Sequence, residues 1–157
     1  MFMEIPGDLC VEAESLRPKM RRIPAVLRSS SDSVDYDPKM VSLGPFHHGK
    51  SEFHLGETFK RQALQMFLSD SGKDRRLFYN KIVNEIDEIR DCYDDDGVWV
   101  DDASLAEMML VDGCFVVFYM EAVVSCEKLV RALYLVGMMG FSFAHRDMLL
   151  LENQIPF

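Results

Sequence analysis

Apolar side chains recur at helical spacing from residue 55 onward, and at no regular spacing before it. The first predicted helix has one apolar face and one polar face. Its apolar face carries Leu55, Phe59, Ala63, Met66 and Phe67, and its polar face carries Glu57, Lys60, Arg61 and Gln65. Apolar positions three or four residues apart are typical of a helix that buries one side. The polar stretch 69–74 is expected to end this helix.

A second apolar stripe follows the break and ends at the acidic turn 94–97. Its members are Phe78, Ile82, Ile86, Ile89 and Tyr93. The third predicted helix begins at a capping box formed by Ser104 and Glu107 and continues to about residue 123. Because its apolar residues lie nearly all round the helix, we expect it to be central and buried.

Two further apolar segments follow the central helix. One covers about residues 127–139, and a short one, 147–153, closes the chain. The pattern therefore predicts a mainly α fold, an irregular helical domain over residues 36–157. Residues 1–35 show little periodicity and are predicted to form a poorly ordered N-terminal tail.

The start of the predicted domain is the exception to the helical pattern. Pro38 and Pro45 each fix φ, and Gly44 precedes the second of them. We therefore expect a short extended or β segment near residues 36–46, with room for one strand or sheet edge.

Composition narrows the class of protein. The chain has 157 residues, of which 48% are hydrophobic and 27% charged, values typical of one globular domain. Its net charge of −9 argues against nucleic acid as a partner, since phosphate binding needs clustered Lys and Arg. The four cysteines form no CxxC pair, which favours free thiols in a reducing compartment.

The longest uncharged run covers residues 132–144 and is shorter than the roughly 20 residues that a membrane-spanning helix needs. The N-terminus carries early acidic residues and no apolar stretch of signal-peptide length. We therefore expect no membrane span in this chain and a cytoplasmic location.

Residues 44–51, GPFHHGKS, match the spelling of the phosphate-binding loop G-x-x-x-x-G-K-[ST]. Such a loop needs small residues, free backbone N–H groups and a preceding parallel strand. Here Pro45 removes one N–H, Phe46 and two histidines add bulk, and no strand–helix alternation supplies a sheet.

We therefore expect no nucleotide binding at residues 44–51. Calorimetry with Mg-ATP should detect no binding to this segment. Micromolar affinity that disappears in the Lys50→Ala variant would contradict the expectation.

The histidines and the acidic loop each suggest a metal site. His47 and His48 are adjacent, however, so in an extended chain they point in different directions. The loop 92–103 resembles a calcium loop, but Cys92 and Ala103 stand where oxygen donors are required. We expect no metal and no other cofactor, and histidines that are hydrogen-bonded or packed.

Asp112 falls on the broad apolar face of the central helix. Because an unpartnered buried carboxylate is strongly destabilising, Asp112 should be buried and hydrogen-bonded. The favoured interpretation is a core carboxylate that fixes chain register. The alternative is a hydrolase that combines the His47/His48 segment with Asp112, and it requires these groups to converge on an open pocket with a nucleophile.

Four stretches of the chain together resemble the plant DUF247 family, also called UPF0481. They are IPAVLR (23–28), YDPKMVSLGPFHHGK (36–50), EMMLVDGCF (107–115) and DMLLLENQIPF (147–157). Their order and spacing agree with the family, and the similarity runs from about residue 21 to the last residue.

No catalytic residue is carried over from the family. The motif residues, interpreted as structural, are Tyr36, Pro38, Gly44, Pro45, His47, His48, Gly49, Asp112, Gly113, Cys114, Phe115, Glu152, Asn153, Gln154 and Pro156.

The resemblance implies a plant protein of largely unknown biochemistry. Relatives usually continue past the last motif and end in a membrane-spanning helix, which implies anchoring at the plasma membrane. Some grass relatives are associated with the pollen side of self-incompatibility, which implies a non-enzymatic role in recognition and protein interaction. This chain is expected to be a truncated or partial member.

The chain departs from the family pattern in three places. Gly56 stands where the family usually has Met, the stretch 121–144 is atypical, and nothing follows Phe157. Ile155 and Phe157 favour burial. We therefore expect them to leave a contiguous apolar patch exposed, together with part of the face of residues 132–144, and we expect self-association through that patch.

Overall fold

The computed structural model describes residues 19–28, 36–94 and 100–156. Its helical elements are α2 (Ala25–Arg28), the 3-10 helix η2 (Ser51–Phe53), α3 (His54–Ser71), α4 (Arg75–Asn84), α5 (Ile86–Asp91), α6 (Asp102–Val124) and α7 (Cys126–Asp147). The prediction of a mainly α fold is confirmed.

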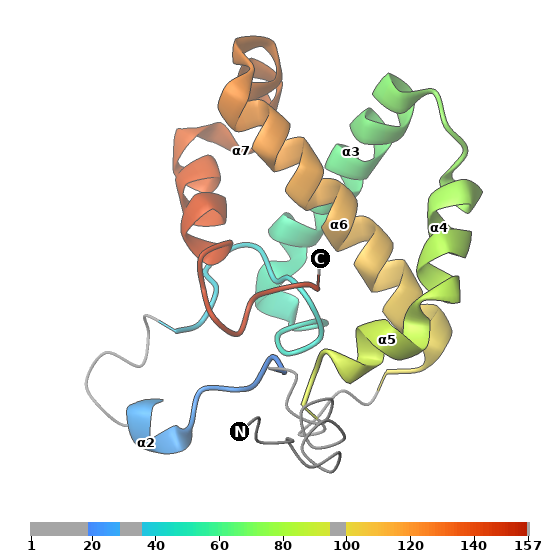
Figure 1. Ribbon diagram of the computed structural model, residues 1–157. Coiled ribbons are helices and arrows are strands. Elements are labelled where there is room, and N and C mark those ends of the chain that lie inside the picture. Colours follow the sequence, from blue (N-terminus) through green and yellow to red (C-terminus); the bar gives the residue numbers. More distant parts are fainter. Residues whose placement is uncertain (1–18, 29–35, 95–99, 157) are drawn as a thin grey trace, which may run out of the picture.

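Helix α6 lies at the centre and packs against α3, α4, α5 and α7 (Figure 1). Most of its side chains are buried, as expected for a helix that is apolar on nearly all sides. Near its C-terminal end, however, Val117, Met120, Val123 and Val124 are exposed. The central helix is therefore largely buried from Leu105 to Val116, with exposed apolar side chains near its end.

The predicted helix ends differ from the observed ones for local reasons. Helix α3 extends into the predicted break and ends at Gly72, which has φ of 63°. The second predicted helix is divided into α4 and α5 at Glu85. Helix α6 is capped by Asp101 instead of Ser104, because the Asp101 carboxylate accepts the backbone N–H of Ser104 at 2.9 Å and its hydroxyl at 2.7 Å.

Helix α7 is longer than predicted. It passes through Gly137, a kink with φ of 70°, and ends at Asp147. The closing apolar segment expected over 147–153 forms no separate helix: Asp147 is the last residue of α7, and turns follow it. No helix among the described residues is long and apolar enough to cross a membrane.

The short extended or β segment expected near residues 36–46 is non-helical and forms no strand. Within the described residues, the only β-type pairing is an isolated parallel bridge between Met20 and Tyr93. The segment's backbone N–H groups bind side chains instead. Since these side chains provide the acceptors that a neighbouring strand would supply, the segment can stay extended without a sheet.

Residues 19–28 fall within the predicted N-terminal tail, but they contact the helical domain. Met20 donates its backbone N–H to Cys92 at 2.8 Å and accepts that of Asp94 at 3.0 Å. Residues 1–18 and 29–35 of the predicted tail lie outside the described residues.

The C-terminal segment also differs from expectation. Ile155 is 7% exposed and belongs to the main hydrophobic cluster, so its expected exposure is wrong, while Phe157 lies outside the described residues. Exposed apolar side chains do occur in the atypical stretch, where Tyr134, Met138 and Met139 are 90%, 70% and 72% exposed. Self-association through that face stays a prediction.

Replacing each of two helical glycines by alanine should have different effects on the free energy of unfolding. A Cβ at Gly56 would lie 1.9 Å from the backbone oxygen of Met40, whereas a Cβ at Gly113 would meet no atom within 4 Å. We expect Gly56→Ala to destabilise the fold by about 2–3 kcal/mol, because the backbone at residue 40 must move. Gly113→Ala should be neutral or stabilise by up to about 1 kcal/mol. Urea denaturation measures both, and equal effects would contradict the observed packing.

Candidate functional site

The four motif stretches meet around the segment 36–50. This segment lies beside the chain that follows α7, below the centre of α6 (Figure 1). Three groups of polar side chains hold it, one at the end of α7, one in the middle of α6 and one around His47. We call these three groups together the motif cluster.

Asp147, the last residue of α7, binds the start of the segment. Its carboxylate accepts the backbone N–H groups of Lys39 at 2.9 Å, Met40 at 2.7 Å and Val41 at 2.9 Å. The side chain of Asp147 is fully buried, and Arg146 contacts the same carboxylate at 3.0 Å. One carboxylate therefore satisfies three successive N–H groups that have no strand partner.

Asn153 binds the next part of the segment with its whole amide. Its Oδ1 accepts the N–H of Leu43 at 2.6 Å, and its Nδ2 donates to the carbonyls of Val41 and Asp147, each at 2.8 Å. Gln154 donates to the carbonyls of Met148 and Leu150 at the end of α7. Each amide hydrogen of Asn153 and its amide oxygen are thus used within the fold.

Asp112, in the middle of α6, binds the glycine that turns the segment. The expectation that it is buried and hydrogen-bonded is confirmed: it is fully buried and accepts the N–H of Gly44 at 2.8 Å. Lys60 of α3 lies 2.5 Å from its other oxygen and also donates to the carbonyl of Ser42 at 2.8 Å. Burial raises the pKa of Asp112, and the contacts with Lys60 and Gly44 oppose that rise.

The predicted position of Lys60 on the polar face of its helix is wrong. Its side chain is 1% exposed and contacts Glu57 at 2.7 Å as well as Asp112. A lysine three residues after Glu57 and next to Arg61 looks solvent-exposed in sequence. A buried aspartate on another helix draws it inward, since an isolated buried charge is strongly unfavourable.

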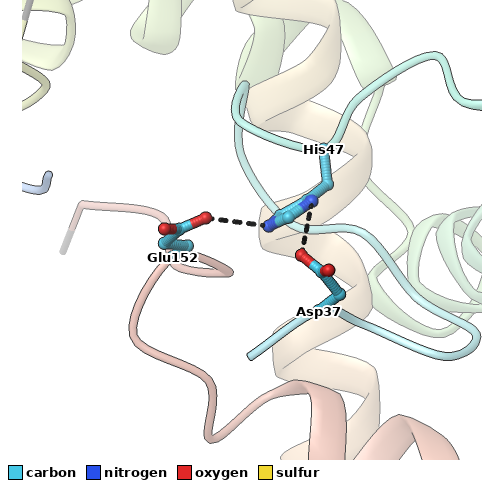
Figure 2. A group of neighbouring side chains, drawn as sticks. All are labelled: Asp37, His47 and Glu152. Atoms are coloured by element: carbon cyan, nitrogen blue, oxygen red, sulfur yellow. Dashed lines mark ion pairs between the residues drawn. The ribbon is translucent and has the colours of Figure 1, made fainter. Parts of the chain in front are cut away.

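The third group surrounds His47, which is 1% exposed (Figure 2). Its imidazole lies between two carboxylates, with Nε2 at 3.3 Å from Glu152 and Nδ1 at 3.9 Å from Asp37. Lys50 lies 3.2 Å from Nδ1. The two imidazole nitrogens therefore face groups from two parts of the chain, the segment 36–50 and the stretch after α7.

Arg28 joins the two carboxylates beside His47. Its guanidinium contacts Asp37 at 3.0 Å and Glu152 at 2.6 Å, and the other oxygen of Glu152 accepts the backbone N–H of Ile23. The N-terminal motif stretch thus contributes both a cation and a backbone donor. Neither Arg28 nor Asp147 was among the expected site residues, although both lie within the motif stretches.

The same three side chains could supply metal ligands. One ligand atom from each of Asp37, His47 and Glu152 lies within 4.8 Å of the others. Because Arg28 already contacts both carboxylates, a cation would have to displace its guanidinium. As arranged, the group is an ion pair with a neutral histidine beside it, and the absence of a metal stays a prediction.

The remaining motif residues shape the segment or fill the core. Gly44 has φ of 68°, and a Cβ there would lie 2.4 Å from the carbonyl of Gln154. Gly49 also has positive φ, at 78°. The other members are buried (Pro38, Pro45, Cys114, Phe115), partly buried (Tyr36, Gly113, Pro156) or exposed (His48).

The two histidines face different surroundings. His48 and Asp112 line one open cleft of about 360 Å³ between α3 and the start of α6, together with Ser104. His47 is not among the residues of that cleft. The structure therefore brings His48, but not His47, to the same cleft as Asp112, and the hydroxyl of Ser104 there is donated to Asp101.

Acid should destabilise the fold through the His47 group. Burial and the charge of Lys50 lower the pKa of His47, so the folded state keeps the imidazole neutral while the unfolded chain protonates it near pH 6.5. Burial raises the pKa of Glu152, but the contacts with Arg28 and Ile23 outweigh it, and the net pKa is lowered. Both contributions are therefore present at neutral pH and are lost as pH falls.

We expect the free energy of unfolding to fall between about pH 7 and pH 5, with His47 contributing up to about 1.4 kcal/mol per pH unit. His47→Gln should flatten that slope. The matched control is His48→Gln, because His48 is exposed. Urea titrations across this range measure both slopes, and an identical slope in the two variants would contradict the assignment to His47.

Comparison with known proteins places these residues in a family context. The family model "DUF247: Plant protein of unknown function" matches residues 20–157. The UPF0481 protein At3g47200 of Arabidopsis thaliana is 31% identical over 126 residues, which cover 78% of this chain and 26% of that protein. The Putative UPF0481 protein At3g02645 of the same plant is 28% identical over 136 residues, which cover 84% of this chain and 24% of that protein.

The chain spans about a quarter of the length of these two relatives. No solved structure matches it. The motif cluster lies within the residues that the family model covers.

Proposed function

This chain belongs to the DUF247 family of plant proteins, and from that premise we propose that it is a protein-interaction domain that recognises a partner protein and is not an enzyme. The observation that carries the proposal is the exposed apolar surface at the end of α6 and along α7. It consists of Val123, Val124, Val130, Tyr134, Met138 and Met139, which are 56–90% exposed. We call this set the α7 surface.

Large exposed apolar side chains that are close together are typical of protein-binding surfaces. Tyrosine and methionine suit such a surface, because both give large contact areas and are enriched where proteins bind one another. Helix α7 is held against α6 by Tyr119, whose ring stacks on Phe141 at 4.7 Å and whose hydroxyl lies 2.7 Å from His145. A partner would therefore meet a helix in a defined position.

The motif cluster also supports the proposal, because its polar groups are used within the fold. Asp147, Asn153 and Asp112 bind the backbone of the segment 36–50, and their carboxylate and amide groups are used in holding the fold. A catalytic carboxylate needs a free position from which to reach a substrate. These side chains are better suited to holding the fold than to reacting with a substrate.

The test is affinity capture from pollen and leaf tissue with the chain and two variants. Tyr134→Glu adds a charge to the α7 surface, while Leu55→Glu adds the same charge to a 64% exposed leucine on α3. Exposed substitutions of this kind should change stability by no more than about 0.5 kcal/mol. We expect proteins retained by the unmodified chain to be retained by Leu55→Glu and lost with Tyr134→Glu. Equal retention by both variants would contradict the proposal.

The alternative proposal is a hydrolase. In its favour, His48, Ser104 and Asp112 line one open cleft. Against it, Asp112 is fully buried and paired with Lys60, and His47 faces Glu152. Hydrolysis of nitrophenyl esters by the purified chain, abolished by His48→Ala and unaffected by Tyr134→Glu, would favour the hydrolase over the interaction domain.

A further inference from the structure

A second feature of the molecule is an apolar cavity of about 410 Å³ on the side of α6 that faces α4 and α5. The residues that line it include Phe67, Phe78, Ile82, Met109 and Ile155. It shares no lining residue with the three polar groups of the motif cluster or with the α7 surface. Its volume falls within the range of small-molecule sites in proteins.

Gly113 is one of the α6 residues that line the cavity. It lies inside that helix, where glycine is less favourable than alanine, and it lines the cavity. A Cβ at this position would meet no atom within 4 Å. The glycine therefore leaves open space at the position of a Cβ.

Lys81 is the one charged side chain among the residues that line the cavity. It lies on α4 and is exposed to solvent. None of the ion pairs formed among the described residues uses its ammonium group. An apolar cavity with a single cation at its edge is complementary to a ligand with one apolar chain and one negative head group.

We propose that this cavity binds a long-chain carboxylate, with the aliphatic chain along Gly113 of α6 and the carboxylate beside Lys81. Binding of the aliphatic chain is favoured because the apolar surfaces of both the ligand and the cavity are removed from water. The head group is placed by charge, since Lys81 is the cavity's one cation. Cys114 also lines the cavity, and burial raises the pKa of its thiol to about 11.

Calorimetry with laurate below its micelle concentration tests the site on the purified chain. We expect one laurate to bind per chain. Gly113→Leu should weaken binding by at least about tenfold, because the leucine side chain fills the cavity. Gly113→Ala should weaken it much less, and circular dichroism of both variants should show an unchanged helical spectrum, so that loss of binding is separated from loss of fold.

The head group is tested with Lys81→Gln and with dodecanol, which has the same chain and no charge. Lys81→Gln should weaken laurate binding about fivefold and leave dodecanol binding unchanged, whereas the control Lys73→Gln should change neither. Vesicles with and without anionic lipid separate free carboxylate from a membrane surface. No laurate binding, binding unaffected by Gly113→Leu, or binding to anionic vesicles alone would each overturn the proposal.

Discussion

Replacing Asp112 by alanine should lower the free energy of unfolding by about 3–4 kcal/mol, which is one of the two largest single effects that we expect. The substitution removes the acceptor of the Gly44 N–H and one of the two carboxylates around the Lys60 ammonium. Glu57 remains 2.7 Å from Lys60, so the ammonium keeps one partner. Asp112→Leu should cost less than alanine, because leucine refills the volume while the Gly44 donor stays unsatisfied. Urea denaturation of the two variants gives the comparison.

A double-mutant cycle separates the ion pair from the cavity. Asp112→Leu combined with Lys60→Met replaces both charges with apolar side chains of similar size, and the double variant should be more stable than Asp112→Leu alone. The exposed pair Arg75–Glu107 is the matched control, with an expected coupling below about 1 kcal/mol. Additive effects at Lys60 and Asp112 would show that the two charges do not interact in the folded protein.

Replacing Asp147 by alanine should also lower the free energy of unfolding by about 3–4 kcal/mol. The buried N–H of Val41 loses its acceptor, and those of Lys39 and Met40 lose theirs at the same time. Lys39 is exposed and can bind water in exchange, whereas Val41 is fully buried and cannot. Thermal and urea denaturation measure the loss.

Two variants make the result specific to the carboxylate. Asp147→Asn keeps one oxygen but turns an amide donor toward backbone donors, so it should lose at least half as much stability as alanine. Asp87→Ala removes an exposed carboxylate from α5 and should change stability by about 0.5 kcal/mol or less. A loss no larger at Asp147 than at Asp87 would contradict the observed contacts.

The helices were the most predictable part of the fold. The apolar spacing identified α3 and α6. The apolar residues of one helix lie three or four positions apart, so the pattern can be read from a short stretch of sequence. The division at Glu85 and the continuation of α7 through Gly137 could not be predicted from spacing, since the apolar pattern does not report a change of backbone angle. The absent strand has a similar cause: extended residues look alike whether a strand or a carboxylate accepts their hydrogen bonds.

The candidate site was predictable in part. Asp112 stood out because a carboxylate in an apolar helix must find a partner. The partners themselves were not predictable, because they lie far away in sequence: Lys60 is 52 residues from Asp112, and Val41 is 106 residues from Asp147. The resemblance to a family identified the stretches of chain that contribute to the site. The structure shows that side chains of these stretches contact one another in the motif cluster.

The central claim is that the polar side chains of the motif cluster hold the segment 36–50 in place of a β partner. Amide hydrogen exchange tests it most directly, because the method reports each backbone N–H separately. The amides of Val41, Leu43 and Gly44 should be protected as strongly as those of α6, although they lie outside every helix, and Asp147→Ala should release Val41. Exchange of these three amides as fast as that of His48 and Gly49 would contradict the claim.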